Sequence, residues 1–156
     1  MTHLPIWYID KLDQPTCTQA FDELKNMGTS VVPSDYWLNH ILEHFAQMAN
    51  TDCGWGYEFS IGESIQFVEK SYDWRIDNPI LSGKSTDYKV TVMCLLNDPS
   101  EYEGGDLTIR LHEEYIPLLH RGSLIAFPSI LEHKVTPVLS GVRYSATKLF
   151  SGPRFK

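Results

Sequence analysis

Three places between residues 75 and 145 carry side chains that bind metals or anions. Arg75 and Asp77 lie two residues apart, Arg143 and Ser145 do the same, and His133 lies between the two pairs. Side chains two apart on a β-strand point to one face, so each pair is expected to face one cavity if its segment is a strand. Carboxylates and imidazoles bind metals, and a guanidinium donates two parallel hydrogen bonds to a carboxylate.

Each of these residues also has an ordinary structural explanation. His133 would be a strand histidine at a sheet edge. Arg143 would make a surface ion pair worth less than about 1 kcal/mol. Asp77 precedes Asn78 and Pro79 and would end a strand as a turn residue. Only the surrounding pattern decides between the two kinds of explanation.

The segments that carry these residues have the pattern of short strands. From Trp55 onward the sequence predicts about eight of them, separated by Gly, Pro, Asn or Asp. Their expected ranges are 56–60, 64–69, 72–77, 89–96, 106–111, 123–127, 133–138 and 142–150. Gly104 and Gly105 are expected to form a turn or bulge between strands. This number and spacing of strands favours a sandwich or barrel.

Helical spacing predominates before residue 55. We predict a helix over 15–27 that stops at Gly28, and a second over 35–49 with Ser34 as its N-cap. The apolar stretch 6–9 is a candidate edge strand. His40 and His44 lie at i and i+4 on the second helix. Because no third ligand is suitably spaced, we expect exposed or boundary histidines rather than a metal site.

These elements predict a mainly β fold with N-terminal helices, arranged as a jelly roll (double-stranded β-helix). We expect a single domain over residues 1–156. An N-terminal strand and supporting helices would occupy 1–54, and the jelly-roll core would occupy 55–150. The helices would pack on one outer face of the sheets.

Composition limits the range of partners. The formal charge of −7, with Lys and Arg scattered singly, disfavours nucleic acid. The odd number of cysteines (Cys17, Cys53 and Cys94) and the lack of C-x-x-C spacing favour buried thiols in a reducing cytoplasm. The N-terminus has no signal-peptide pattern, and the longest apolar run, Val92 to Leu96, is far short of a membrane span. We therefore expect a cytoplasmic protein without a membrane partner, and the oligomeric state stays open.

Fragments between about residues 64 and 150 resemble the prolyl-hydroxylase-like branch of the iron(II)/2-oxoglutarate oxygenases. The family patterns are Y-x-W-H-x-D, L-N-D, Y-x-G-G-x-L, G-x-L-x-x-F-P-S, H-x-V-x-P-V and G-x-R-x-S. Their counterparts here begin at Tyr72, Leu96, Tyr102, Gly122, His133 and Gly141. Each fragment alone is a weak signal, and their shared order makes the resemblance specific.

The resemblance implies cofactors and roles. It implies Fe(II) held by Asp77 and His133, and 2-oxoglutarate whose far carboxylate is bound by Arg143 with support from Ser145. The family's facial triad of two histidines and a carboxylate leaves positions for a keto acid and O₂. The implied reaction couples oxidative decarboxylation of 2-oxoglutarate to hydroxylation of a protein side chain or a small molecule.

One position departs from the family pattern. Arg75 stands where the family has its first metal histidine. A guanidinium stays protonated and offers only donors, so it cannot bind iron and would repel a divalent cation. It would instead pair with Asp77 and fill the metal position. Asp73, on the same expected strand face, is about 7 Å further along, and the positions of His112 and His120 cannot be inferred.

The departure leaves competing hypotheses. The first is an oxygenase in which iron binding is weakened or lost. The second is a catalytically inactive jelly-roll module that binds an anion or a partner, with Arg75 and Arg143 holding a dicarboxylate without metal. A third, a sugar- or protein-binding β-sandwich of another family, would make the order of the fragments a coincidence.

Overall fold

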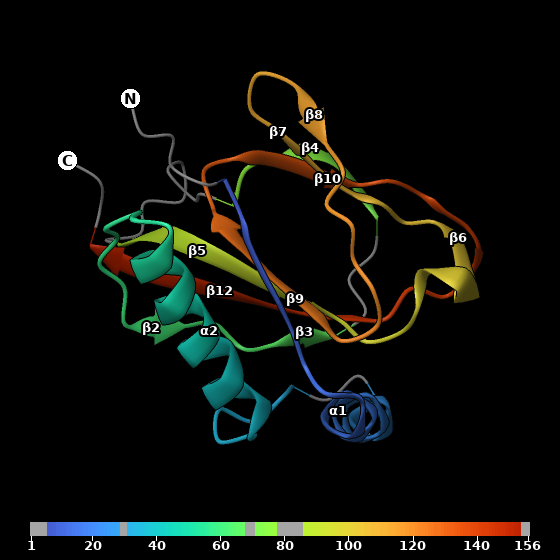
Figure 1. The fold of residues 1–156 in the computed structure, drawn as a ribbon. Helices are drawn as coiled ribbons and strands as arrows, with labels where there is room; N and C mark the ends of the chain where they lie inside the picture. The colour runs from blue at the N-terminus through green and yellow to red at the C-terminus, as the bar shows by residue number, and fades with distance from the viewer. Residues whose placement is uncertain (1–5, 29–30, 68–70, 78–85, 154–156) are drawn as a thin grey trace.

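The computed structural model describes residues 6–28, 31–67, 71–77 and 86–153 (Figure 1). The N-terminal elements are β1 (Tyr8–Lys11), α1 (Gln14–Met27) and α2 (Leu38–Asp52). The strands that follow are β2 (Ile61–Gly62), β3 (Gln66–Phe67), β4 (Tyr72–Arg75), β5 (Thr86–Leu95), β6 (Tyr102–Gly104), β7 (Leu107–Arg110), β8 (Glu114–Tyr115), β9 (Ser123–Pro128), β10 (Glu132–Val135), β11 (Val138–Gly141) and β12 (Ser145–Pro153). A 3₁₀ turn, Pro99–Glu101, precedes β6.

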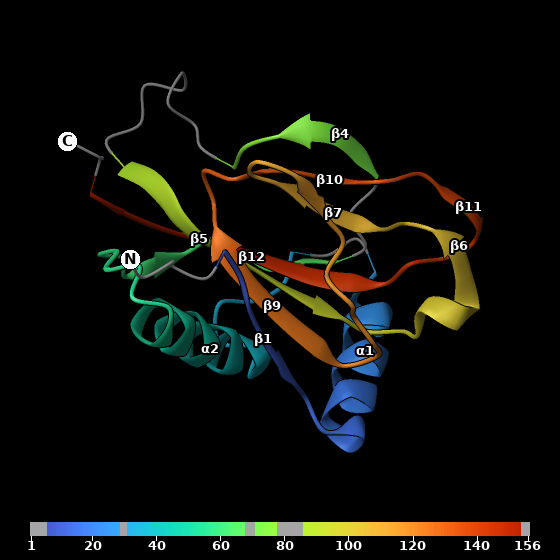
Figure 2. The same cartoon turned by 45° about the horizontal axis from the view of Figure 1, so that its top comes forward.

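The elements form three layers, which Figures 1 and 2 show from two directions. The helices cover one face of a large sheet with the order β1-β9-β5-β12-β2, in which β3 also pairs with β12. A smaller sheet, β4-β10-β7-β8, lies over the opposite face, and β6 pairs with β11 at one end. The strand pairs are antiparallel. The predicted mainly β fold with N-terminal helices is confirmed.

Strand β5 separates the two apolar cores. Val90, Val92 and Cys94 belong to the cluster that also contains the buried residues of both helices. Met93 belongs to the second cluster, formed by residues of both sheets. Because side chains alternate along a strand, Thr91 points to the same side as Met93, into the space between the sheets.

The first helix forms where the sequence predicts it. The Asp13 carboxylate caps α1 by accepting a hydrogen bond of 2.8 Å from the backbone N–H of Thr16. Gly28, with a φ of 61°, ends the helix. The buried face consists of Cys17, Ala20 and Leu24.

The predicted start of the second helix is wrong. Its first residue is Leu38, and Trp37 occupies the cap position without a side-chain capping bond, so Ser34 is not the N-cap. A turn precedes the helix, since the N–H of Tyr36 and the side-chain amide of Asn39 both donate to the carbonyl of Pro33 at 3.1 Å.

The two histidines at i and i+4 lie on this helix. His40 and His44 are exposed, as the sequence analysis expected.

Several strand boundaries also differ from the prediction. Residues 56–60 form no strand, because the Asn50 side chain binds the N–H and carbonyl of Tyr57, and Gly56 has a φ of 67°. The predicted strand 133–138 ends at Val135 in the structure, and the predicted strand 142–150 begins only at Ser145.

Further differences concern strands whose positions the sequence pattern defined poorly or did not indicate. The edge strand predicted over 6–9 runs from Tyr8 to Lys11, and β2, β6, β8 and β11 were not predicted. Residues 68 and 69 of the predicted strand 64–69 lie outside the described residues. Gly104, at the end of β6, and Gly105 have positive φ, which is consistent with the expected turn or bulge between strands.

Two further expectations concern the interior and the membrane. Cys17, Cys53 and Cys94 are buried and free, as expected. Within the described ranges, the helices are too short or too polar to cross a membrane.

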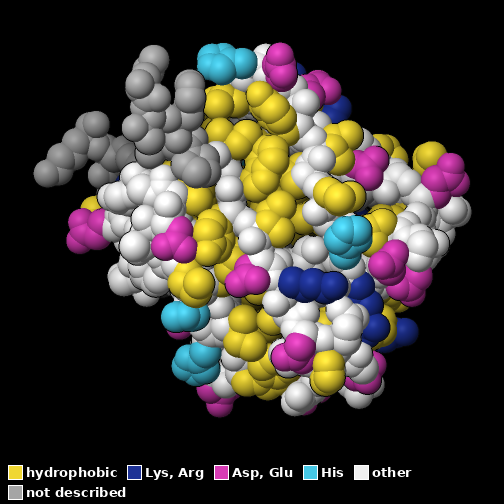
Figure 3. Space-filling view, in the orientation of Figure 1, with side chains coloured by type: hydrophobic (Ala, Val, Ile, Leu, Met, Phe, Trp, Pro, Cys, Tyr) yellow, Lys and Arg dark blue, Asp and Glu magenta, His cyan; other side chains and the backbone are white. Residues whose placement is uncertain are grey.

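Figure 3 shows a band of hydrophobic side chains that descends from the β7–β8 hairpin over one face. The exposed apolar residues of that hairpin and the loop after it are Leu111, Ile116 and Leu118.

Candidate metal and anion site

The pairing of β4 with β10 places the first candidate residues. Arg75 lies opposite His133 and Tyr72 lies opposite Val135, with an irregularity between the two pairs. Three steps along β4 therefore correspond to two steps along β10, which defines a β-bulge. The extra residue reverses the alternation of side chains. Tyr72 and Arg75 consequently share a face, and the Arg75 Cζ lies 3.4 Å from the Tyr72 ring centroid.

The bulge changes the expected place of Asp73. The expectation that Asp73 shares a strand face with Arg75 is wrong. The Asp73 Oδ1 accepts a hydrogen bond of 2.8 Å from the N–H of Trp74, and its side chain lines a separate pocket. It offers no replacement for the missing metal ligand.

Asp77 lies just beyond β4, in a bend rather than in the predicted strand. Its backbone N–H donates to the carbonyl of Ser129 at 2.9 Å. Its Oδ2 accepts a hydrogen bond of 3.0 Å from the Thr91 hydroxyl, and this hydroxyl lies 2.8 Å from that of Ser129. Strand β5 and the turn after β9 therefore fix the carboxylate and the backbone of Asp77, whose side chain is only 8% exposed.

His133 points at this carboxylate from β10. Its Nε2 lies 3.0 Å from Oδ2 of Asp77, and its side chain is 1% exposed. The Nδ1 lies 2.9 Å from the carbonyl of Leu131, which only accepts, so Nδ1 carries the proton. In the neutral ring the Nε2 lone pair is then free for a metal.

The contact of Nε2 with Asp77 is close but poorly directed. Although Nε2 lies within ion-pair distance of Oδ2, it is buried without a hydrogen bond of acceptable geometry. The two atoms are close enough for a hydrogen bond, but their relative direction does not suit one. A buried nitrogen and a carboxylate oxygen that converge without bonding suit two ligands of one metal ion.

Arg75 approaches the other oxygen of the carboxylate. Its Nε lies 3.5 Å from Oδ1 of Asp77, and its side chain is 42% exposed. The expected pairing with Asp77 is therefore present. The guanidinium does not fill the space between Asp77 and His133, because it lies over the Tyr72 ring. It adds a positive charge beside the two candidate ligands.

A third protein ligand is absent from the described part of the chain. No three His, Cys, Asp or Glu side chains within it are grouped to hold a metal ion. His112 and His120 are exposed, in the β7–β8 turn and in the loop before β9. The residues present thus fit two of the three positions of a facial triad.

Arg143 is buried on the same side of the large sheet as Met93. It is 4% exposed, and its Nη1 and Nη2 donate to Oγ of Ser145 at 3.2 Å and to Sδ of Met93 at 3.0 Å. Its Nε has no partner, and no carboxylate of the described residues lies within 4 Å of the guanidinium. A buried cation in this state favours an anion as its partner.

A cavity of about 160 Å³ opens beside Arg143. Leu107 and Tyr102 line it, and burial raises the pKa of the Tyr102 hydroxyl while the nearby Arg143 opposes this shift. The exposed side chains of Ile116 and Leu118 form part of its rim. The cavity is therefore small and mostly apolar, with Arg143 and Asp106 as the charged residues of its lining.

Strand β5 relates the two halves of the site. Thr91 contacts the Asp77 carboxylate and Met93 contacts the Arg143 guanidinium. Side chains two apart on one strand face are about 7 Å apart. The structure therefore brings Asp77 and His133 together, and places Arg143 and Ser145 one such step along the same interior.

Sequence reasoning missed Thr91 and Ser129, which orient Asp77. The available signal was weak: Thr91 is the polar residue within the otherwise apolar run from Val90 to Leu96. A hydroxyl inside a buried strand needs a partner, so it indicates a polar contact without identifying it.

Both the sequence and the fold are similar to those of known proteins. Residues 64–151 match the family model described as the 2OG-Fe(II) oxygenase superfamily. A PKHD-type hydroxylase from Synechococcus sp. (strain CC9605) is 42% identical over 77 residues, which are 48% of this chain and 34% of the relative. The matches span about a third of the length of these curated relatives.

Solved structures support the fold. A Pseudomonas putida prolyl-4-hydroxylase superposes with a TM-score of 0.69 at 17% identity, covering 97% of this chain and 94% of that one. The viral collagen prolyl hydroxylase of Paramecium Bursaria Chlorella virus-1, in its 2OG complex, gives 0.66 at 14% identity, covering 95% and 97%. At such identities the likeness shows the fold alone, and it confirms the predicted jelly roll.

Proposed function

We propose that this chain, which belongs to the 2OG-Fe(II) oxygenase superfamily, catalyses 2-oxoglutarate-dependent hydroxylation of a protein side chain or a small molecule. We also propose that Arg75 lowers its affinity for iron. The 3.0 Å convergence of Asp77 and His133 carries this proposal. Fe(II) and 2-oxoglutarate are the cofactors expected of the family.

The proposed reaction has a simple balance. As 2-oxoglutarate loses CO₂ and becomes succinate, one atom of O₂ enters succinate and the other enters a substrate C–H bond. Iron supplies this oxidising chemistry when it is bound, and the protein supplies ligands, orientation and a dry cavity. Asp77 and His133 would hold the metal, while Thr91 and the Leu131 carbonyl fix the orientations of these two ligands.

Arg143 and Ser145 would bind the far carboxylate of 2-oxoglutarate. The Arg143 Nε has no partner, and its two other nitrogens contact only neutral groups, a hydroxyl and a thioether. A carboxylate would supply the missing acceptor and charge, with hydrogen bonds stronger than those between neutral groups. The separation of about 7 Å along β5 leaves room for a short dicarboxylate between this residue and the candidate metal ligands.

Arg75 would weaken the metal site in two ways. It removes one nitrogen ligand, and it holds a fixed positive charge 3.5 Å from the remaining carboxylate. Both effects disfavour a divalent cation at Asp77 and His133. The family chemistry would then proceed slowly, in proportion to the fraction of protein that holds iron.

The decisive experiment is the substitution Arg75→His. We expect higher Fe(II) affinity and more succinate from 2-oxoglutarate than in the unchanged protein. Arg75→Lys is the matched control, because it keeps the charge and adds no ligand, and it should show neither gain. If Arg75→His gains no iron affinity, the proposed metal site on β4 and β10 is wrong.

A second candidate function is dicarboxylate binding without metal. The buried Arg143, without a carboxylate partner among the described residues, favours it. Calorimetry with 2-oxoglutarate in the presence of a chelator would detect such binding. Binding that requires added Fe(II) would exclude this alternative.

We also propose a cytoplasmic location, which the three free, buried cysteines support.

A further inference from the structure

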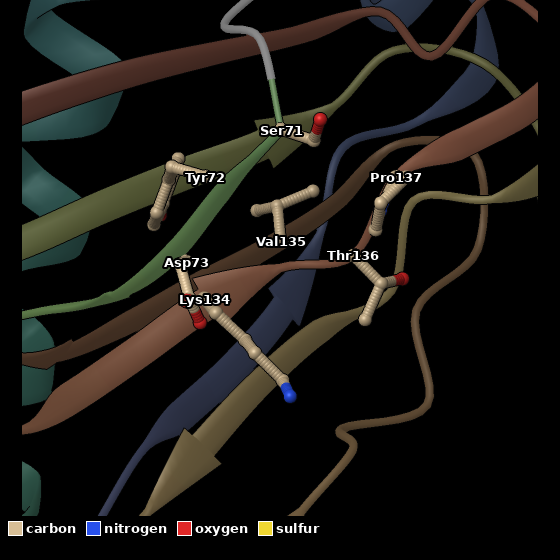
Figure 4. A pocket seen from close by; sticks show the side chains of 7 residues that line it. All are labelled: Ser71, Tyr72, Asp73, Lys134, Val135, Thr136 and Pro137. Carbon is tan, nitrogen blue, oxygen red and sulfur yellow. The ribbon is translucent and has the colours of Figure 1, made fainter.

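A second pocket lies beside the β4 bulge and carries two opposite charges. Its volume is about 370 Å³, and it lies between the start of β4 and the end of β10 (Figure 4). The Asp73 carboxylate and the Lys134 side chain line it from these two strands. The bulge is what places both Asp73 and Trp74 opposite the single residue Lys134.

Trp74 restrains both charged groups. Its backbone N–H donates to Oδ1 of Asp73 at 2.8 Å, and its ring centroid lies 4.5 Å from Nζ of Lys134. A cation over an aromatic ring is attracted without being neutralised. Asp73 and Lys134 are both described, and no ion pair within 4 Å joins them. The pocket therefore presents a negative and a positive group that do not compensate each other.

The remaining walls suit a small aliphatic group. Pro137 contributes exposed apolar surface, whereas Val135 is 2% exposed, and Ser71 and Thr136 contribute hydroxyls. The hydroxyl oxygen of Thr136 accepts from the N–H of Asp106, which leaves its own hydrogen for another acceptor. The volume falls within the range of roughly 300–1,000 Å³ that is usual for small-molecule sites.

Tyr72 connects this pocket to the candidate metal site. Its side chain lines the pocket, and its ring meets the His133 ring edge-on with centroids 5.7 Å apart. A molecule in the pocket would thus lie one side chain away from the candidate metal ligands.

We infer that the pocket binds a free α-amino acid with an aliphatic side chain, as the zwitterion. Its ammonium group would pair with Asp73, its carboxylate with Lys134, and its side chain would pack against the exposed ring of Pro137. That this amino acid is the substrate rests on the proposed hydroxylase function. Its binding does not, since it needs neither iron nor 2-oxoglutarate.

Matched ligands test the charge requirement. Calorimetry would compare L-leucine with leucinamide, which lacks the carboxylate, and 4-methylpentanoate, which lacks the ammonium group, in chelator without 2-oxoglutarate. We expect L-leucine to bind with a Kd of about 1 mM, because packing of its apolar side chain adds to two weak, exposed ion pairs. Each analogue should bind about fivefold more weakly, which is the upper end of what one exposed ion pair contributes. Equal binding of all three ligands, or no binding of L-leucine, would overturn the inference.

Matched variants test the two charges separately. Asp73→Asn should weaken L-leucine binding by about fivefold and leave 4-methylpentanoate unaffected, and Lys134→Gln should spare leucinamide instead. Asn at 73 retains the acceptor for the Trp74 N–H, so the bulge should survive. Glu103→Gln and Lys11→Gln are the controls, because both residues are exposed and lie outside the pocket. Variants that bind L-leucine like the unchanged protein would overturn the assignment.

The failure of this inference can be told apart from the failure of the proposed function. Succinate production by Arg75→His without any L-leucine binding would overturn the pocket assignment alone. L-leucine binding without succinate from either protein would leave the pocket assignment standing and overturn the hydroxylase function. A blocked peptide, acetyl-Gly-Leu-Gly-amide, that binds more tightly than L-leucine would overturn the inference in favour of a protein substrate.

Discussion

Arg75 lies directly opposite His133 across the β4–β10 pair. Residues directly opposite on antiparallel strands have Cβ atoms about 4.5–5.5 Å apart. A side chain at position 75 can therefore reach the space beside Asp77 that His133 reaches from the other strand. One residue thus determines whether this end of the cavity offers two or three metal ligands.

The first prediction concerns stability rather than activity. Co(II), as an oxygen-insensitive substitute for Fe(II), should raise the melting temperature of Arg75→His, because a ligand that binds only the folded state stabilises it. At a metal concentration 100 times the dissociation constant the gain would be about 2.7 kcal/mol. Differential scanning calorimetry measures the shift. The unchanged protein should shift far less, and equal shifts in both would refute the role of position 75.

The second prediction concerns Thr91, which orients Asp77 from β5. In the Arg75→His background, Thr91→Val should lower Co(II) affinity about 10- to 100-fold, the usual effect of losing a partner of a metal ligand. Thr91→Ser keeps the hydroxyl and should restore most of the affinity. The Co(II) absorption spectrum follows the ligand geometry directly. Unchanged affinity in Thr91→Val would show that the backbone of Asp77 alone positions the carboxylate.

The third prediction concerns Arg143. Arg143→Met should reduce 2-oxoglutarate affinity by about 10- to 150-fold, since a charged hydrogen bond contributes about 1.5–3 kcal/mol. Arg143→Lys should recover only part of it, because an ammonium lacks the planar fork. Titration calorimetry measures both, with the exposed Arg110 changed to Lys as the control. Full affinity in Arg143→Met would place the keto acid elsewhere.

The fourth prediction compares two glycines that both have positive φ. Gly104 has a φ of +79°, and an added Cβ would lie 2.0 Å from the carbonyl oxygen of Pro137. Gly28 has a φ of +61° and no atom within 4 Å of that position. Gly104→Ala should cost clearly more than Gly28→Ala, in which backbone strain alone costs roughly 1–3 kcal/mol. Urea unfolding would reveal the difference, and equal costs would contradict the close contact.

The fifth prediction concerns pH. Burial lowers the pKa of Lys148 below its ordinary value of 10.5, although Glu43 and Glu63 oppose the shift. Above the lowered pKa the unfolded chain binds this proton more strongly, so folding gains stability as the pH rises towards 10.5. The unchanged protein should therefore gain stability relative to Lys148→Met as the pH rises towards 10.5. A difference in unfolding free energy that is constant with pH would contradict this.

Much of the fold could be predicted from local patterns. Helix α1 has a clear cap and a clear stop, and β5 has an apolar run bounded by turn residues. The fragment order also placed Asp77, His133 and Arg143 on segments that the structure brings to one interior. These features depend on short-range chemistry that a sequence displays directly.

The site's finer geometry could not be predicted, for a physical reason. The β4 bulge arises from the register between β4 and β10, and a register belongs to two strands rather than to one segment. Alternation from Arg75 therefore assigned Asp73 to the wrong face. The contact of Thr91 with Asp77 is likewise non-local, since it joins two strands through side chains alone.

Strand β5 has a consequence for how this protein tolerates change. Its even-numbered positions, such as Val92, pack against the helices, whereas Thr91 and Met93 contact the residues proposed to bind metal and anion. Strand β5 thus separates the side chains of the helix-covered hydrophobic core from the side chains that contact the proposed ligand-binding residues. Substitutions on the cavity side of β5 can therefore alter which ligand binds while the hydrophobic core on the helix side stays intact. The ligand-binding cavity can thus change in evolution without loss of the fold.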